Sequence, residues 1–467
     1  MVSYLPRQIS KTAIYLYIGA LAAVSLLYIR FTMPLWSTLL GLMWVIGFFL
    51  LSNHFSEQWA RVPQKKYIKF IFWTALGLRA AWVIFSYFFY KAQTGVPFEF
   101  AAADALAYHE DATWLASTKW KYAWDYLFTS RITYSDSGYP LYLSLVYRLL
   151  GPNIIPARLL KALIGAFSCI LLYRLASRNI GEEGGRMAGV FACFMPNLII
   201  YCGLHLKETE MLFLLIAFLE RTDNLLRSKH YTVLSVAVPI LLALSLFFFR
   251  TVLGAAAAFS FVTAILFTPS RTIGKGKRFL IIGWVVLTLA LLAGGTIINE
   301  TESYWEQRDD NQNQKRTAQT IRGNQWAKYA TGTVMAPMMF VLPFPTMVDV
   351  EQQYNQNIMH GGNYVRNFFG IFVLIAVFSA IFIKKDWRNY ALIGSFVIAY
   401  LGIISASGFA NSERFLLPGL PVLLILAANG ISLLNAKNYR WVRIWYCVVP
   451  VMVIAWAFFK VGSRGLF

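Results

Sequence analysis

Residues 34–51 read PLWSTLLGLMWVIGFFLL, a run of eighteen residues without a charged side chain. As a helix this run would be about 27 Å long, close to the ~30 Å hydrocarbon core of a bilayer. Apolar runs of similar length recur along the whole chain. The sequence therefore predicts an all-α fold, a polytopic bundle of transmembrane helices.

Composition agrees with this fold class. Of the 467 residues 58% are hydrophobic and 14% charged, whereas soluble domains have about 45–50% and 25%. The net charge of +20 suits loops on the cytoplasmic side of a membrane better than nucleic-acid binding. No nucleic-acid partner is therefore predicted. The cysteines lie in or beside apolar runs and are predicted to be buried thiols: Cys169, Cys193, Cys202 and Cys447.

About thirteen spans are predicted by length. They lie at about 13–30, 34–51, 70–90, 157–175, 187–202, 206–220, 231–249, 252–268, 278–298, 367–383, 389–406, 414–433 and 441–459. Tyr139–Leu150 is too short to cross and is predicted to be an interfacial helix introduced by Pro140. With that helix left out of the count, every basic loop falls on the side of Arg7 and Lys11. The N-terminus is therefore predicted to be cytoplasmic.

This topology places two polar segments, 91–137 and 299–366, outside the cytoplasm. The chain then divides into an N-terminal pair of spans with a cytoplasmic loop (1–68), a catalytic transmembrane module (69–298), an outer loop with a re-entrant or interfacial piece (299–366), and C-terminal spans (367–467). ATP and nucleotide sugars are unsuitable direct substrates on the outer side. No phosphate-binding glycine-rich loop occurs in the sequence.

The first outer segment contains ADALAYHEDA at 103–112. Asp104 and Tyr108 share one face if this stretch is helical. Asp104 is either part of a solvated acidic loop or a catalytic carboxylate. Aromatic residues interleave the segment, as in amphipathic interfacial helices. A carboxylate held near low dielectric by such helices has a raised pKa and can act as a base.

A second group of ionisable residues lies at predicted outer ends of spans. His205, Lys207, Glu208 and Glu210 form one turn, which is either an internally neutralised hairpin or a site facing a wet cavity. Arg250 and Arg414 lie on the side that usually lacks arginine, and either side chain could simply snorkel to headgroups. Together with Lys207, these two arginines are candidates for a phosphate site.

Several of these residues occur in a recognisable order. The order comprises Asp104-x3-Tyr108-x3-Ala112, Gly138-Tyr139-Pro140-Leu141-Tyr142, Tyr147–Gly151, Ala157-Arg158-Leu159, Pro196, Glu208, Glu210 and Arg414–Pro421. Over roughly a third of the chain this resembles the GT-C superfamily of integral-membrane glycosyltransferases. The nearest group is that of the protein O-mannosyltransferases and lipid A aminoarabinose transferases. Ala105 replaces a second acid common in relatives, and two additional spans precede the catalytic loop.

The resemblance implies a polyprenyl-phosphate-linked sugar donor and a lipid, glycan or protein acceptor at the outer face of the membrane. Because the sequence shows no retention signal, this membrane is expected to be a bacterial inner membrane. Asp104 becomes the general base and Glu208 a second acid that orients the acceptor or Lys207. The expected substrate-binding residues are Tyr108, Tyr139, His205, Lys207, Glu210, Arg250 and Arg414. No metal site is assigned, and a divalent metal ion is left open as a cofactor.

Three other interpretations compete with this one. A polysaccharide polymerase or ligase of the O-antigen type would depend on arginines of the 299–366 loop, such as Arg308, Arg316 and Arg322. A lipid or solute transporter would place ionisable residues near span centres and repeat its span pattern. The sequence suggests neither feature of a transporter. A purely structural scaffold would leave the outer charges unexplained.

Overall fold

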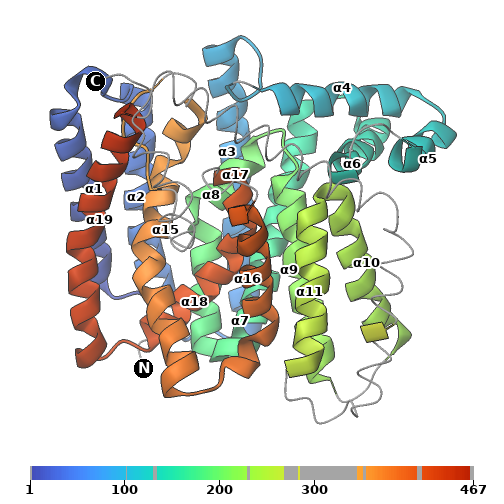
Figure 1. Ribbon diagram of the computed structural model, residues 1–467. Coiled ribbons are helices and arrows are strands. Elements are labelled where there is room, and N and C mark those ends of the chain that lie inside the picture. Colours follow the sequence, from blue (N-terminus) through green and yellow to red (C-terminus); the bar gives the residue numbers. More distant parts are fainter. Residues whose placement is uncertain are drawn as a thin grey trace.

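The computed structural model of the protein describes residues 3–100, 102–129, 134–228, 232–267, 282–283, 344–350, 354–406 and 413–462. These residues form helices joined by turns, and none of them forms a β-strand. Most of the helices lie side by side along one direction, while α4 and α5 lie across one end of the bundle (Figure 1). The all-helical fold class predicted from the sequence is confirmed for these residues.

The helices have the following bounds. The first half contains α1 (Arg7–Leu27), α2 (Leu35–Trp59), α3 (Gln64–Thr94), α4 (Ala103–Ser117), α5 (Trp120–Thr129), α6 (Tyr134–Leu150), α7 (Ile154–Phe194), α8 (Pro196–Ile200) and α9 (Glu208–Arg227). The second contains α10 (Val233–Phe249), α11 (Thr251–Phe267), α15 (Tyr354–Phe378), α16 (Ala391–Ala406), α17 (Glu413–Leu416), α18 (Leu420–Ser432) and α19 (Ala436–Gly462).

Within the described ranges, eight helices are long and apolar enough to cross a membrane. They are Arg7–Leu27, Leu35–Trp59, Gln64–Thr94, Ile154–Phe194, Tyr354–Ile383, Trp387–Ile404, Glu413–Ser432 and Ala436–Gly462. Helices α10 and α11 are apolar but shorter, and α9 carries several charges. The predicted number of thirteen is therefore not established. The predicted span 278–298 lies outside the described residues, except for 282–283.

Helix α7 is two helices joined at Gly181, whose φ of 85° and ψ of 165° interrupt the helical backbone. The positive φ is a conformation that glycine adopts without the steric cost of a Cβ. The two arms pack so closely that a Cβ on Gly185 would lie 2.6 Å from the backbone of Ser177. The predicted spans at 157–175 and 187–202 therefore belong to one tight helical hairpin, and the second of them breaks before Pro196.

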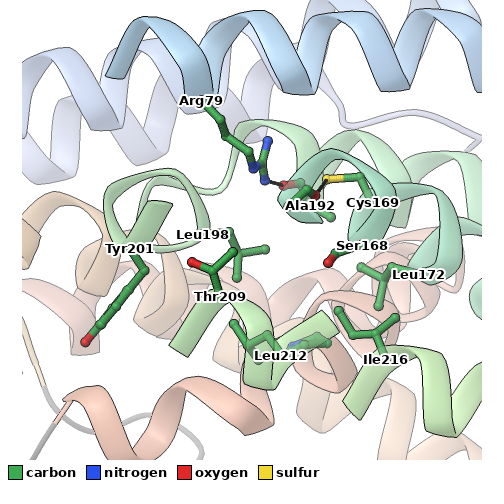
Figure 2. Close-up of a pocket in the computed structure, with 12 residues that line it drawn as sticks. Arg79, Ser168, Cys169, Leu172, Ala192, Leu198, Tyr201, Thr209, Leu212 and Ile216 are labelled. Atoms are coloured by element: carbon green, nitrogen blue, oxygen red, sulfur yellow. Dashed lines mark hydrogen bonds between the residues drawn. The ribbon is translucent and has the colours of Figure 1, made fainter. Parts of the chain in front are cut away.

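Arg79, near the middle of α3, donates hydrogen bonds to backbone carbonyls at that break. Pro196 has no N–H, so the carbonyl of Ala192 lacks its usual helical donor. The guanidinium of Arg79 donates to Ala192 O (3.0 Å) and to Cys193 O (3.2 Å). Figure 2 shows this contact beside a cavity of about 20 Å³, room for roughly one water molecule. The sequence-based expectation that no ionisable residue lies near a span centre is wrong for Arg79.

The two N-terminal helices share a core with the C-terminal ones. The hydroxyl of Tyr17 on α1 lies 2.8 Å from Nε2 of His360 on α15, and Tyr364 of α15 donates to Ala13 O at 2.7 Å. Gly41 of α2 leaves room for His360, because a Cβ there would lie 2.0 Å from the imidazole. These helices are thus integral to the bundle, although the resemblance presents them as an addition.

Two helix boundaries differ from the prediction. Helix α6 begins at Tyr134, so Pro140 lies inside it and does not introduce it. Helix α15 begins at Tyr354, thirteen residues before the predicted span, and its first turns are buried among other helices. The rest of the predicted outer loop, apart from residues 344–350, lies outside the described residues. Three cysteines are buried as predicted, whereas Cys447 is exposed on α19.

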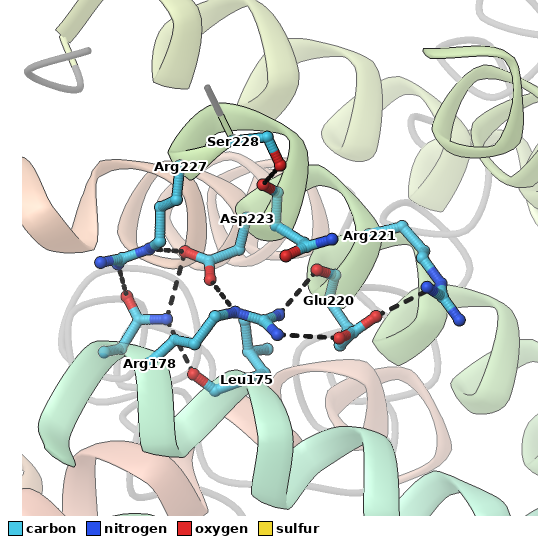
Figure 3. A network of polar contacts seen from close by, with 9 residues as sticks. Leu175, Arg178, Glu220, Arg221, Asp223, Arg227 and Ser228 are labelled. Atoms are coloured by element: carbon cyan, nitrogen blue, oxygen red, sulfur yellow. Dashed lines mark hydrogen bonds and ion pairs between the residues drawn. The ribbon is translucent and has the colours of Figure 1, made fainter. Parts of the chain in front are cut away.

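The basic loops that the structure describes, a set that leaves out 271–278, gather at the end of the bundle opposite α4 (Figure 1). Arg186 of α7 donates there to Trp59 O and Ala60 O, each at 3.0 Å. Beside it, Arg178 of α7 binds Glu220 and Asp223 of α9 (Figure 3). The loops thus share one end, as the positive-inside argument requires. The side of the membrane that this end faces stays a prediction.

Candidate functional site

Four residues singled out in the sequence meet at the α4 end of the bundle. They are Asp104, Glu208, Arg250 and Arg414. Arg414 links the two carboxylates, with Nη1 bonded to Asp104 Oδ2 and Nε bonded to Glu208 Oε1. Arg250 reaches the same oxygen of Glu208, with Nη2 3.4 Å from Oε1. Asp104 and Arg414 are 310 positions apart along the chain, so only the folded bundle brings them together.

Each of these side chains is positioned by the end of a helix. Asp104 and Glu208 lie in the first turns of α4 and α9, where carboxylates interact favourably with the helix dipole. Arg250 is the residue between α10 and α11 and has an extended backbone, with φ of −166°. Its guanidinium lies over the ring of Phe415 at 4.5 Å and donates to the Tyr400 hydroxyl at 3.4 Å.

The four side chains form a gradient of burial. The side chain of Glu208 is 0% exposed and that of Arg250 6%, while Arg414 is 22% and Asp104 57% exposed. Arg414 therefore joins a buried carboxylate to one that faces solvent. Glu208 Oε2 has no hydrogen-bond partner among the described residues. Charge-assisted bonds to arginine are short and directional, and a buried carboxylate without its cation would be costly.

Lys161 of α7 holds a neighbouring carboxylate and was missed in the sequence. Its Nζ lies 3.6 Å from Glu210 Oε2 and donates to Leu204 O (2.9 Å) and Leu206 O. Glu210 is therefore paired with Lys161. The signal was present, because a lysine inside an apolar run is costly unless it has partners. Lys207 is buried immediately before Glu208, where its charge acts on that carboxylate.

Behind α4, three side chains form a buried chain of hydrogen bonds. His205 Nε2 lies 3.0 Å from the Tyr147 hydroxyl, which lies 2.8 Å from His109 Nδ1. Burial lowers the pKa of His205 well below its ordinary value, and the positive charges of Arg158 and Lys161 lower it further. Burial also lowers the pKa of half-buried His109. Both imidazoles are therefore neutral near pH 7.

Two tyrosines that were expected to bind substrate lie between this chain and the carboxylates. The rings of Tyr108 and Tyr139 pack edge to face at 5.2 Å, and Tyr139 is fully buried. Lys161 Nζ donates to the Tyr139 hydroxyl at 3.4 Å. In this structure Tyr139 therefore packs against Tyr108 of α4 and accepts a hydrogen bond from Lys161.

The sequence argument also missed buried polar groups around the site. Arg158 donates to Pro97 O at 2.7 Å, and its positive charge opposes the rise in the pKa of Glu99 that burial causes. On α15, Asn363 donates to Glu413 Oε1 and accepts from Asn197 at 3.2 Å. Glu413 directly precedes Arg414. The polar first half of α15 thus packs behind the arginine, which explains why this helix extends into the predicted loop.

No group of three or more His, Cys, Asp or Glu residues in the described part of the chain has the arrangement of a metal site. The long apolar helices and the ionisable residues gathered at one end define an integral membrane protein built as a helical bundle. Comparisons with known proteins add no narrower identity, since no family model and no curated protein matches the chain.

Proposed function

We propose that this chain is a membrane glycosyltransferase. It moves a sugar from a polyprenyl-phosphate-linked donor to a lipid, glycan or protein acceptor at the outer face of a bacterial inner membrane. The observation that carries the proposal is the contact of Asp104 with Arg414. Arg414 also binds Glu208, and Glu208 in turn binds Arg250. A partly exposed carboxylate bonded to one arginine, with a second arginine linked through Glu208, combines a base with groups that bind phosphate.

In the proposed reaction, an acceptor hydroxyl or amine attacks C1 of the donor sugar from the side opposite the phosphate. The new C1–acceptor bond forms as the C1–O bond to phosphate breaks, and the configuration at C1 inverts. The bonding pair leaves with the phosphate oxygen, and Asp104 takes the acceptor proton. Arg414 and Arg250 stabilise the negative charge of the leaving lipid phosphate. Glu208 holds both arginines in place.

A transporter is the second candidate, and one observation favours it. Ionisable side chains are buried inside helices that can span a membrane, among them Arg79, Lys161 and His360, and such residues often mark transport pathways. Each of these three has partners that fasten helices together. The polymerase alternative rests on Arg308, Arg316 and Arg322, which lie outside the described residues.

The test uses purified protein in nanodiscs with a panel of radiolabelled polyprenyl-phosphate sugars and membrane extract as acceptor. Asp104→Asn should lower transfer about 10²- to 10⁴-fold, the usual contribution of a general base. Glu110→Gln is the matched control, because it removes an exposed carboxylate from the same helix and should leave transfer unchanged.

Full transfer by Asp104→Asn would refute its role as the base. If wild type transfers no sugar from any donor but moves lipid or solute across liposomes, the protein is a transporter. Loss of transfer on substitution of Arg316 or Arg322, with Asp104→Asn active, would favour the polymerase or ligase.

A further inference from the structure

We infer that Arg414 is shared between Asp104 and the donor phosphate, so that donor binding releases Asp104 to act as a base. The inference rests on the proposed function and adds an order to it, in which the donor binds before the acceptor is activated. In the structure, Asp104 is engaged by Arg414. The bond occupies Asp104 Oδ2, one of the two carboxylate oxygens that could take the acceptor proton.

The two partners of Arg414 differ in how firmly they are held. Glu208 is fully buried at the start of α9 and has Arg250 as a second cation. Asp104 lies on α4, which crosses the end of the bundle (Figure 1), and more than half of its side chain is exposed. An incoming anion can therefore displace Asp104 from Arg414 at low cost, whereas displacing Glu208 would take one of its two cations from a fully buried carboxylate.

The chemistry of phosphate suits this exchange. A guanidinium binds the oxygens of a phosphate in a two-pronged geometry, as it binds a carboxylate. The sugar–phosphate donor is a diester with one negative charge, while the lipid phosphate product is a monoester carrying about −1.5 to −2 charge at pH 7. The product should thus compete with Asp104 more strongly than the donor does, and its departure returns Asp104 to Arg414.

The experiment measures binding of polyprenyl monophosphate, without any sugar, to nanodisc-embedded protein by thermophoresis. Asp104→Asn removes the competing anion and should bind this lipid about three- to thirtyfold more tightly than wild type, a coupling typical of contacting charges. Glu110→Gln removes one negative charge from the same helix and should bind as wild type does. It controls for the general charge of α4.

A double-mutant cycle assigns the effect to Arg414. Arg414→Ala should bind the lipid phosphate at least tenfold more weakly, and adding Asp104→Asn to it should change nothing further. Arg414→Lys keeps the positive charge without the two-pronged geometry and should show an intermediate gain from Asp104→Asn. Thermal unfolding confirms that each variant is folded, and the lysine variant serves if the alanine variant is not.

Unchanged or weaker binding by Asp104→Asn would overturn the inference, and so would a gain that persists in the Arg414→Ala background. If Asp104→Asn loses transfer but binds the lipid phosphate no more tightly, the inference fails while the proposed function survives. If the binding cycle holds and no donor supports transfer, the glycosyltransferase proposal fails. Absence of binding by wild type and by every variant would refute both.

Discussion

Helix α9 carries carboxylates at both of its ends, and each end meets arginines in a different way. At its start, Glu208 is bound by Arg250 and Arg414. At its other end, Glu220 and Asp223 are bound by Arg178 of α7 (Figure 3). The two networks use the same chemistry at opposite ends of one helix, so comparing them offers a way to test which of them serves function.

In the network of Arg178, Glu220 and Asp223, called the far network below, the contacts are local. Arg178 bonds Asp223 Oδ2 at 2.7 Å, Glu220 Oε1 at 2.9 Å and the Glu220 carbonyl at 2.8 Å. The partners lie 42 to 45 positions apart on two helices in contact. In the near network, at the start of α9, Arg414 bonds Glu208 and Asp104, which lie 206 and 310 positions away along the chain. Of these two carboxylates, that of Asp104 is exposed. The far network fastens α7 to α9, whereas the near one presents charge to solvent.

The largest effect that separates the networks is expected for Arg414→Ala. Transfer should fall about 10²- to 10³-fold, the usual loss when a group that stabilises developing negative charge is removed. The melting temperature should change little, because Arg250 still neutralises the buried carboxylate of Glu208. Initial rates and thermal unfolding in the same nanodiscs measure both effects. Near-normal transfer by a folded Arg414→Ala protein would show that the near network is not needed for transfer.

The opposite result is expected for Arg178→Ala. Two buried carboxylates would lose their main partner, so the free energy of unfolding should fall by about 2–3 kcal/mol, less than for a fully buried pair because Arg178 is 26% exposed. Transfer per folded molecule should not change. Denaturant titration followed by tryptophan fluorescence measures the first quantity. A loss of turnover without a loss of stability would mean that the far end also takes part in function.

The sequence predicted the members of the near network better than its connections. Glu208, Arg250 and Arg414 were chosen because they lie at predicted outer ends of spans, where ionisable residues are costly unless they have a role. Asp104 was chosen because it lies in an outer segment interleaved with aromatic residues. Periodicity and span length also predicted the helical bundle. Neither argument measures contacts between distant segments, so the bridging position of Arg414 could not be predicted.

Other features escaped because their cause is tertiary. Lys161 looked like part of an apolar span, and only the fold shows Glu210 beside it. The polar first half of α15 resembled a loop because its side chains find partners inside the bundle, such as Tyr17 for His360. Hydropathy alone cannot detect this compensation.

Lowering the pH should destabilise the protein through His205, which lies just before the start of α9. Its pKa in the folded protein is well below the ordinary value because the imidazole is buried, whereas the unfolded chain takes up a proton near pH 6.5. The unfolded state therefore binds more protons below that pH, and stability falls as pH is lowered. From pH 7.5 to 5.5 the loss from this one group should be about 1–1.5 kcal/mol.

The measurement is the pH dependence of thermal unfolding for wild type and His205→Gln. The glutamine keeps a polar side chain but does not titrate, so the variant should lose less stability on acidification. Identical pH slopes for the two proteins would show that His205 does not remain neutral in the folded state. The comparison is internal to each protein, so a lower starting stability of the variant does not affect it.

The smallest effect is expected at the rim of the far network. Arg227 is 37% exposed and bonds Asp223 Oδ1 at 3.0 Å, four residues away on α9. Such pairs contribute about 0.3–0.5 kcal/mol, so Arg227→Ala should lower stability by roughly this amount and leave transfer unchanged. Denaturant titration in low salt measures it, and the difference from wild type should shrink in 1 M salt. A loss as large as that of Arg178→Ala would mean that the far network acts as one cooperative unit, since Asp223 would then depend on both arginines together.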